Sequence, residues 1–214
     1  DMTTATKDKS KAGKQIYIGA QTRFETGFLN PYDDNSRPVV YGSGNVYYLA
    51  AENIRKTAEI AAESHLKPVT VYIGGGTPTS LDAEYLKEIT DTINECFDMK
   101  AVKEFTVEAG RPDTIDEEKL TLLKNAGVTR ISINPQTFSD SVLRAIGRCH
   151  TASDVVDKFL LARGLGFDNI NMDFIAGLPG DTYESFRNSI DKAIALSPEN
   201  ITVHTLALKR AANI

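Results

Sequence analysis

The feature that most constrains this chain is an apolar stretch that runs directly into three glycines. Val69–Ile73 is rich in β-branched residues, which is typical of a buried strand. Gly74–Gly76 and a Thr-Pro pair follow, and a helical pattern begins at Ser80 or Asp82. Because glycine has no Cβ atom, such a turn lets backbone N–H groups approach a ligand at a helix start. The stretch favours a ligand-binding turn; a tight turn that binds nothing is the alternative.

The rest of the chain repeats short apolar segments, each followed by a helical pattern. Strand, helix, strand in succession predicts a parallel sheet with right-handed crossovers. Polar residues or glycines close several strands, and in a barrel such ends share one mouth. This favours an α/β fold, a partial (βα)6 barrel, over an open doubly wound sheet. The six strands are expected at Gln15–Ala20, Val69–Ile73, Glu104–Gly110, Arg130–Asn134, Asn169–Ile175 and Ile201–Leu206.

Two helix starts carry capping signals. Thr114 with Glu117 forms a capping-box pattern for a helix that Gly127 ends. Asp181 with Glu184 does the same for a helix reaching Leu196. We therefore expect these pairs to cap the third and last long helices of the chain.

Composition narrows the class of protein. The 214 residues suffice for one large domain, and residues 1–14 are a polar, lysine-rich tail. A net charge of −5 argues against general nucleic-acid binding and against a basic membrane-binding surface. No apolar run approaches a membrane span, so a cytoplasmic protein is expected. Cys96 and Cys149 are the only cysteines and match neither a disulfide framework nor a zinc pattern.

Two acidic residues lie in strands. Glu108 ends an apolar strand and could accept the hydroxyls of a ribose; a solvent-facing or helix-capping acid is the alternative. Asp173 lies inside an apolar strand, where a charge is rarely buried without a partner. Arg148 is a candidate partner, or a clamp for a ligand carboxylate, or a surface arginine. These three residues are candidates for a functional site.

Three other side chains carry weaker signals. Gln136 follows a proline in a loop and could hydrogen-bond a ligand. His204 lies in an apolar strand and is expected in the core or at the barrel mouth rather than on a metal. Cys96 is expected to be a buried structural thiol.

Five motifs occur in a fixed order and together resemble one family. They are similar to the radical S-adenosylmethionine (SAM) enzymes of the oxygen-independent coproporphyrinogen III oxidase family, above all its clostridial and bacillar branch, and the resemblance covers about Gln15–Arg210. The motifs are Tyr72–Thr79, Val107–Pro112, Arg130–Phe138, Ile146–Arg148 with His150, and Asn171–Gly180.

The resemblance implies a partial (βα)6 barrel that spans residues 15–214 and stops before the family's C-terminal domain. It implies a [4Fe–4S] cluster that cleaves SAM, and a 5′-deoxyadenosyl radical that starts decarboxylation of porphyrinogen propionates to vinyl groups. A porphyrinogen or related tetrapyrrole and an electron donor are the implied partners. The implied SAM-binding positions are Tyr17, Gly75, Gly76, Thr77, Glu108, Gln136, Arg148, Asp173 and Ala207.

One departure from the family concerns the cluster. The family places three cysteines, spaced C-x3-C-x2-C, just after its first strand, where this chain has Arg23, Gly27 and Asn30. None of these can be a thiolate ligand of iron. SAM is therefore the expected cofactor, whereas the cluster is expected of the family but not supported by this chain. The hypotheses are an enzyme core of porphyrin biosynthesis, a cluster-less barrel that binds SAM or a tetrapyrrole without catalysis, and an unrelated barrel enzyme that binds phosphate at the glycine turn.

Overall fold

The structure, a computed structural model, describes residues 43–75 and 77–206, with side chains from Ala51 onward. The polar tail 1–14 and the expected strand Gln15–Ala20 lie outside these residues. None of the helices described is long and apolar enough to cross a membrane.

The described residues form one parallel sheet of five strands. Strands adjacent in the chain are adjacent in the sheet, in the order β1-β2-β3-β4-β5. A doubly wound sheet reverses its strand order at a switch point, and this sheet does not. The order is that of a barrel wall, and five of the six expected strands are confirmed. The strands are β1 (Thr70–Ile73), β2 (Glu104–Glu108), β3 (Arg130–Gln136), β4 (Ile170–Ala176) and β5 (Asn200–Thr205).

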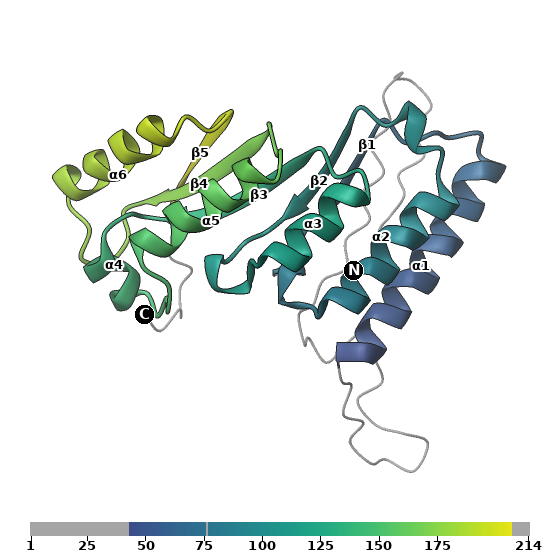
Figure 1. The fold of residues 1–214 in the computed structure, drawn as a ribbon, viewed down its shortest axis with the longest axis horizontal. Coiled ribbons are helices and arrows are strands. Elements are labelled where there is room, and N and C mark those ends of the chain that lie inside the picture. Colours follow the sequence, from purple (N-terminus) through teal and green to yellow (C-terminus); the bar gives the residue numbers. More distant parts are fainter. Residues whose placement is uncertain (1–42, 76, 207–214) are drawn as a thin grey trace, which may run out of the picture.

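Helices connect successive strands, and α3 and α5 run beside the sheet (Figure 1). The long helices alternate with the strands, as right-handed parallel crossovers require. The α-helices are α1 (Ser43–Glu63), α2 (Ala83–Cys96), α3 (Glu117–Asn125), α4 (Asp140–Ala145), α5 (Ala152–Gly164) and α6 (Tyr183–Leu196). Short 3₁₀ helices are η1 (Pro78–Ser80), η2 (Met99–Ala101) and η3 (Pro112–Thr114).

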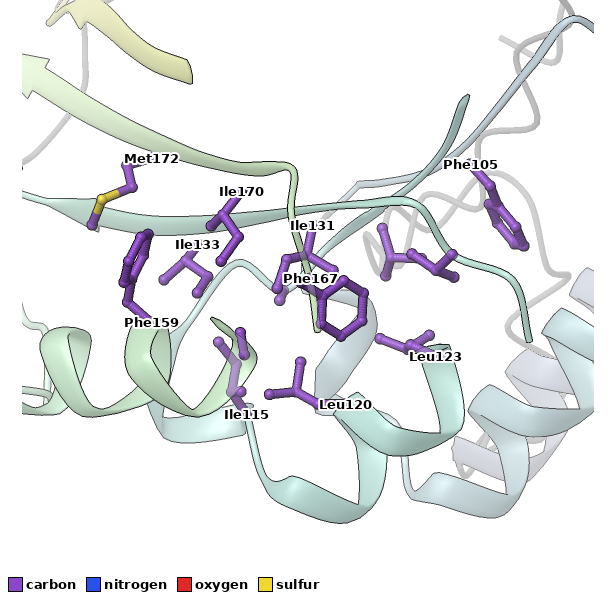
Figure 2. Packing of buried hydrophobic residues seen from close by; sticks show 14 of the residues in the cluster. Phe105, Ile115, Leu120, Leu123, Ile131, Ile133, Phe159, Phe167, Ile170 and Met172 are labelled. Carbon is purple, nitrogen blue, oxygen red and sulfur yellow. The ribbon is translucent and has the colours of Figure 1, made fainter. Parts of the chain in front are cut away.

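One face of the sheet is apolar and forms the core against the helices. Alternate strand residues, among them Ile133 and Met172, are fully buried on this face. Figure 2 shows Phe159 of α5 beside Ile133 and Met172, and Leu120 of α3 below the sheet near Phe167. Burial of each such side chain contributes roughly 1.5–3 kcal/mol. This packing fixes the helices to the sheet.

The opposite face of the sheet, which we call the inner face, is polar. A doubly wound parallel sheet is covered by helices on both faces and is apolar on both. A polar second face is instead expected when no helix covers that face and it lines the inside of an open barrel. The inner face comprises one apolar residue, Ile175, and the polar or aromatic alternate strand positions Thr70, Tyr72, Glu104, Thr106, Glu108, Arg130, Ser132, Asn134, Asn171, Asp173, Asn200, Thr202 and His204.

The predicted helix caps are corrected by the structure. Asp116, not Thr114, caps α3, because its Oδ1 accepts the N–H of Lys119 at 2.7 Å. Thr114 is instead the last residue of η3, and this 3₁₀ turn moves the helix start along the chain. In α6 the capping box is formed by Thr182 and Ser185. The end of α3 before Gly127, whose φ is +86°, agrees with the sequence.

Candidate functional site

The glycine turn after β1 contacts the carboxylate that ends β2. The N–H of Gly75 donates to Oε2 of Glu108 at 3.2 Å, and the hydroxyl of Tyr72 donates to Oε1 at 2.5 Å. β1 and β2 pair in parallel, with Tyr72 opposite Thr106, so the ends of the two strands lie side by side. The structure therefore brings two predicted site residues, Gly75 and Glu108, into direct contact at the carboxyl edge of the sheet.

Two of the glycines are required by geometry. Gly75 has a φ of +91°, a conformation that strains other L-residues. A Cβ on Gly74 would lie 2.3 Å from Cε1 of Tyr72 and 3.1 Å from Cδ of Glu108. Gly74 thus makes room for the Tyr72–Glu108 pair, a role that the sequence did not indicate. Gly76 lies outside the described residues.

The surroundings of Tyr72 raise the pKa of its phenol. Burial raises the pKa of Tyr72, and the hydrogen bond to Glu108 and the charges of Glu108 and Asp173 raise it further. Tyr72 therefore remains a donor across the neutral range. A carboxylate has about four acceptor positions, of which Glu108 uses two here. The remaining positions can accept two hydroxyl groups of a ligand.

The segment after the turn is held by buried contacts with the β2–α3 region. The side chain of Thr79 is fully buried, and its hydroxyl lies 2.7 Å from that of Thr114. Nζ of Lys119 donates to the carbonyl oxygen of Thr79 at 2.9 Å. Thr77 is half-buried, and its carbonyl oxygen accepts the hydroxyl of Ser80 at 2.7 Å. These bonds tie the glycine turn to the body of the domain.

The end of β3 contains a bulge. Ile133 pairs with Met172 and Gln136 pairs with Phe174, so Asn134 and Pro135 together face one residue of β4. Proline has no N–H to give to the sheet and is tolerated at bulges. Gln136 ends this strand with a φ of +66° and is buried, which corrects its predicted position in a loop.

The turn after Gln136 is fixed by a serine of α6. Oγ of Ser189 accepts the N–H of Phe138 at 3.0 Å and lies 3.2 Å from the hydroxyl of Thr137. All three residues are buried. The bulge and the contacts of Ser189 together set the position of Gln136 on β3, the strand adjacent to the one that carries Asp173.

Asp173 is half-buried on the inner face, and its partner is an asparagine. Nδ2 of Asn171 donates to Oδ1 of Asp173 at 2.7 Å. Among the residues that the structure describes, Arg148 forms no ion pair with Asp173, so the first of its predicted roles is corrected. The charges that shift the pKa of Arg148 are those of Arg111 and Asp113, which follow β2. The position of Arg148 depends on the conformation of the loop after α4, which the sequence pattern does not predict.

Arg148 and His150 lie at the start of the α4–α5 connection. Burial lowers the pKa of Arg148, and the charge of Arg111 lowers it further, against the opposing effect of Asp113. His150 is 5% exposed, and neither ring nitrogen has a hydrogen-bond partner among the described residues. Burial lowers the pKa of His150, and the nearby carbonyl of Pro135 partly opposes this shift.

The cysteines do not fit an iron–sulfur cluster. Iron–sulfur clusters are held by sets of cysteine thiolates. The chain has two cysteines: Cys96, half-buried on α2, and Cys149, exposed after α4. Among the described residues, no three His, Cys, Asp or Glu side chains gather as a metal site. Arg23, Gly27 and Asn30, with Tyr17 and Ala207, lie outside the described residues. His204 is exposed on the inner face of β5, not in the core.

A cavity of about 430 Å³ lies at the opposite, amino-terminal edge of the sheet. Its lining includes Glu104 and Arg130, which are 3.5 Å apart, and Glu199, which pairs with Arg163 at 2.9 Å. These charges are already satisfied by protein partners. Barrel enzymes carry their sites at the carboxyl ends of the strands. The cavity therefore does not compete with the glycine edge as the candidate site.

The structure thus gathers part of the predicted set. Gly75 and Glu108 are bonded, and Gln136 and Asp173 lie on neighbouring strands. Sequence reasoning missed Tyr72, Ser132 and Asn171, although the alternation of polar with apolar residues along each strand carried the signal. The charge of Asp173 is among those that raise the pKa of Tyr72.

Comparisons with known proteins agree with this geometry. A family model described as the radical SAM superfamily matches residues 30–193. The chain is 47% identical over 162 residues to the oxygen-independent coproporphyrinogen-III oxidase-like protein HemZ of Bacillus subtilis (strain 168), covering 75% of this chain and 32% of that protein. It is 45% identical over 141 residues to the heme chaperone HemW of the same organism, covering 65% and 37%. The chain spans about a third of the length of these relatives.

A solved structure gives the same result for the fold. The coproporphyrinogen III oxidase HemN from Escherichia coli, described as a radical SAM enzyme, matches with a TM-score of 0.68 and 25% identity, over 79% of this chain and 39% of that one. The expected barrel fold and the resemblance drawn from the motifs are both confirmed. Because the family model matches most of its length, the chain belongs to the radical SAM superfamily.

Proposed function

We propose that this chain binds SAM at the carboxyl edge of its sheet and serves heme or porphyrin metabolism in the cytoplasm. The observation that carries the proposal is the glycine turn bonded to Glu108. The turn offers close backbone approach, and the carboxylate keeps two acceptor positions for the hydroxyls of a ribose. The names of the relatives HemZ and HemW support the link to heme.

Each residue of the site would contact a different part of SAM. Glu108 accepts hydrogen bonds from the hydroxyls of the sugar, the amide of Gln136 exchanges hydrogen bonds with the sugar or base, and Arg148 offers its planar donors to the methionyl carboxylate. Thr77 and Gly75 line the turn, and Asp173 accepts a donor group of the ligand. When bound, SAM supplies a sulfonium group whose chemistry depends on what reduces or attacks it. The two cysteines do not fit a cluster, so we derive no radical step through this chain.

Two roles are compatible with SAM binding at this edge, one catalytic and one not. One is oxidative decarboxylation of a porphyrinogen, with the tetrapyrrole and an electron donor as partners, which the names of the coproporphyrinogen oxidase HemN and the oxidase-like protein HemZ suggest. The other is a cluster-less barrel that binds SAM or a tetrapyrrole without catalysis. The cysteine count favours the second, and the relatives named heme chaperone HemW are consistent with it.

Calorimetric titration with S-adenosylhomocysteine tests the proposal. Glu108→Gln replaces the carboxylate by an amide of the same shape and should weaken binding about 10- to 150-fold, because hydrogen bonds to charged groups contribute roughly 1.5–3 kcal/mol. Glu104→Gln is the matched control: it lies on the same strand and face, but its carboxylate pairs with Arg130 at the other edge. Equal affinities for the two variants would refute the role of Glu108.

A further inference from the structure

A buried asparagine joins three strands of the inner face. Asn171 is 4% exposed. Its Nδ2 donates to Oγ of Ser132 on β3 at 2.8 Å and to Oδ1 of Asp173 on β4 at 2.7 Å. Its Oδ1 accepts the hydroxyl of Thr202 on β5 at 3.0 Å. Every polar atom of this amide is therefore used.

The direction of these bonds leaves one orientation for the amide. The hydroxyl of Ser132 donates to Oδ1 of Asn134 at 2.9 Å, so its oxygen is available to accept from Asn171. Thr202 supplies a hydroxyl donor to the amide oxygen. Turning the amide over would set its oxygen against the carboxylate of Asp173, an acceptor facing an acceptor. The N–H group is thus directed at Asp173 by its neighbours on both sides.

The consequence concerns the second oxygen of Asp173. Oδ1 is held by Asn171, whereas Oδ2 has no hydrogen-bond partner within residues 43–75 and 77–206. We propose that Asn171 is a positioning residue that holds Asp173 with Oδ2 presented to an N–H or O–H donor of the S-adenosyl ligand. This inference rests on the proposed function. A carboxylate held in advance loses less conformational freedom on binding than a free one.

Affinity for S-adenosylhomocysteine tests this role through a matched pair and a double-mutant cycle. Thr202→Val removes one hydroxyl that orients the amide, and Thr106→Val removes an equally shaped group that bonds Glu104 instead. We expect Thr202→Val to weaken binding about 3- to 5-fold and Thr106→Val less than about 2-fold. Asn171→Leu should cost about 10-fold in the wild-type chain and less than about 2-fold in Asp173→Ala.

The cycle separates positioning from general support of the fold. If Asn171→Leu costs as much in Asp173→Ala as in the wild-type chain, Asn171 does not act through Asp173 and the proposal is overturned. Equal affinities for Thr202→Val and Thr106→Val would overturn it as well. Thermal unfolding of each variant shows whether Asn171→Leu folds. If it does not fold, the comparison of Thr202→Val with Thr106→Val tests the proposal.

A ligand-free measurement keeps the inference distinct from the proposed function. The two side-chain amide protons of Asn171 can be followed by ¹H–¹⁵N NMR. Asp173→Ala should shift the proton directed at the carboxylate and leave the one directed at Ser132 nearly unchanged. Unchanged signals would show that Asn171 does not hold Asp173. If the wild-type chain does not bind S-adenosylhomocysteine, the proposed function fails, while these signals still decide the link between the two side chains.

Discussion

Lys119→Met should destabilise the domain by loosening the segment after the glycine turn. The side chain of Lys119 is 15% exposed, and its Nζ donates to the carbonyl oxygens of Thr79 at 2.9 Å and Thr114 at 3.5 Å. Thr79 is fully buried, so its carbonyl loses a charged donor that water does not readily replace. Bonds of this kind contribute about 1.5–3 kcal/mol. The variant should therefore unfold with a free energy lower by about 2 kcal/mol.

Urea unfolding followed by circular dichroism measures this loss as a lower urea midpoint. In a separate thermal scan, a loss of about 2 kcal/mol should lower the melting temperature by roughly 4–8 °C in a chain of this size. Lys87→Met is the control, because Lys87 pairs with Asp91 on the exposed face of α2, with 62% of its side chain exposed. An exposed pair is screened by solvent and should leave the midpoint unchanged. Equal midpoints for the two variants would refute the claim that the buried contact to Thr79 stabilises the turn.

Three further predictions follow from burial and charge. Phe159→Ala, at 1% exposed, should cost about 3–5 kcal/mol in chemical unfolding, whereas its neighbour Leu160→Ala, at 56% exposed, should cost little; similar losses would contradict the packing shown in Figure 2. Because burial lowers the pKa of His150, the unfolded chain binds more protons below about pH 6.5, so stability should fall from there toward the lower folded pKa. His150→Leu should flatten that pH profile; an unchanged slope would exclude His150 as its source. Gly75→Ala should weaken S-adenosylhomocysteine binding, because φ is +91° there, and full affinity in calorimetry would show that the turn adapts.

The sequence predicted the strands because their apolar runs are short, bounded and regularly spaced. Asp173 and Glu108 were visible as charges at defined places in these runs. The placement of Gly75 and Glu108 at one edge also followed, since parallel neighbours end at the same edge, but their direct hydrogen bond is a finding of the structure. The pattern of the strands predicts which residues lie at the same edge and on the same face of the sheet.

The remaining features depend on geometry that the pattern does not carry. The bulge at Asn134 and Pro135 arises from pairing with β4 and moves Gln136 from the expected loop into the strand end. Asp173 is only one of the candidate partners that charge suggests for Arg148, and in the structure the charges that shift the pKa of Arg148 are those of Arg111 and Asp113. Thr114 matched a capping pattern, but a 3₁₀ turn uses it first, so Asp116 caps α3.

The amount of SAM and iron bound per chain tests the central claim most directly. The chain would be reconstituted anaerobically with iron and sulfide, incubated with labelled SAM, separated from free ligand and assayed for both. Our account predicts about one SAM and near-zero iron per chain, because the glycine edge binds the ligand and two separate cysteines do not hold a cluster. A stable four-iron cluster, or the absence of bound SAM, would contradict it.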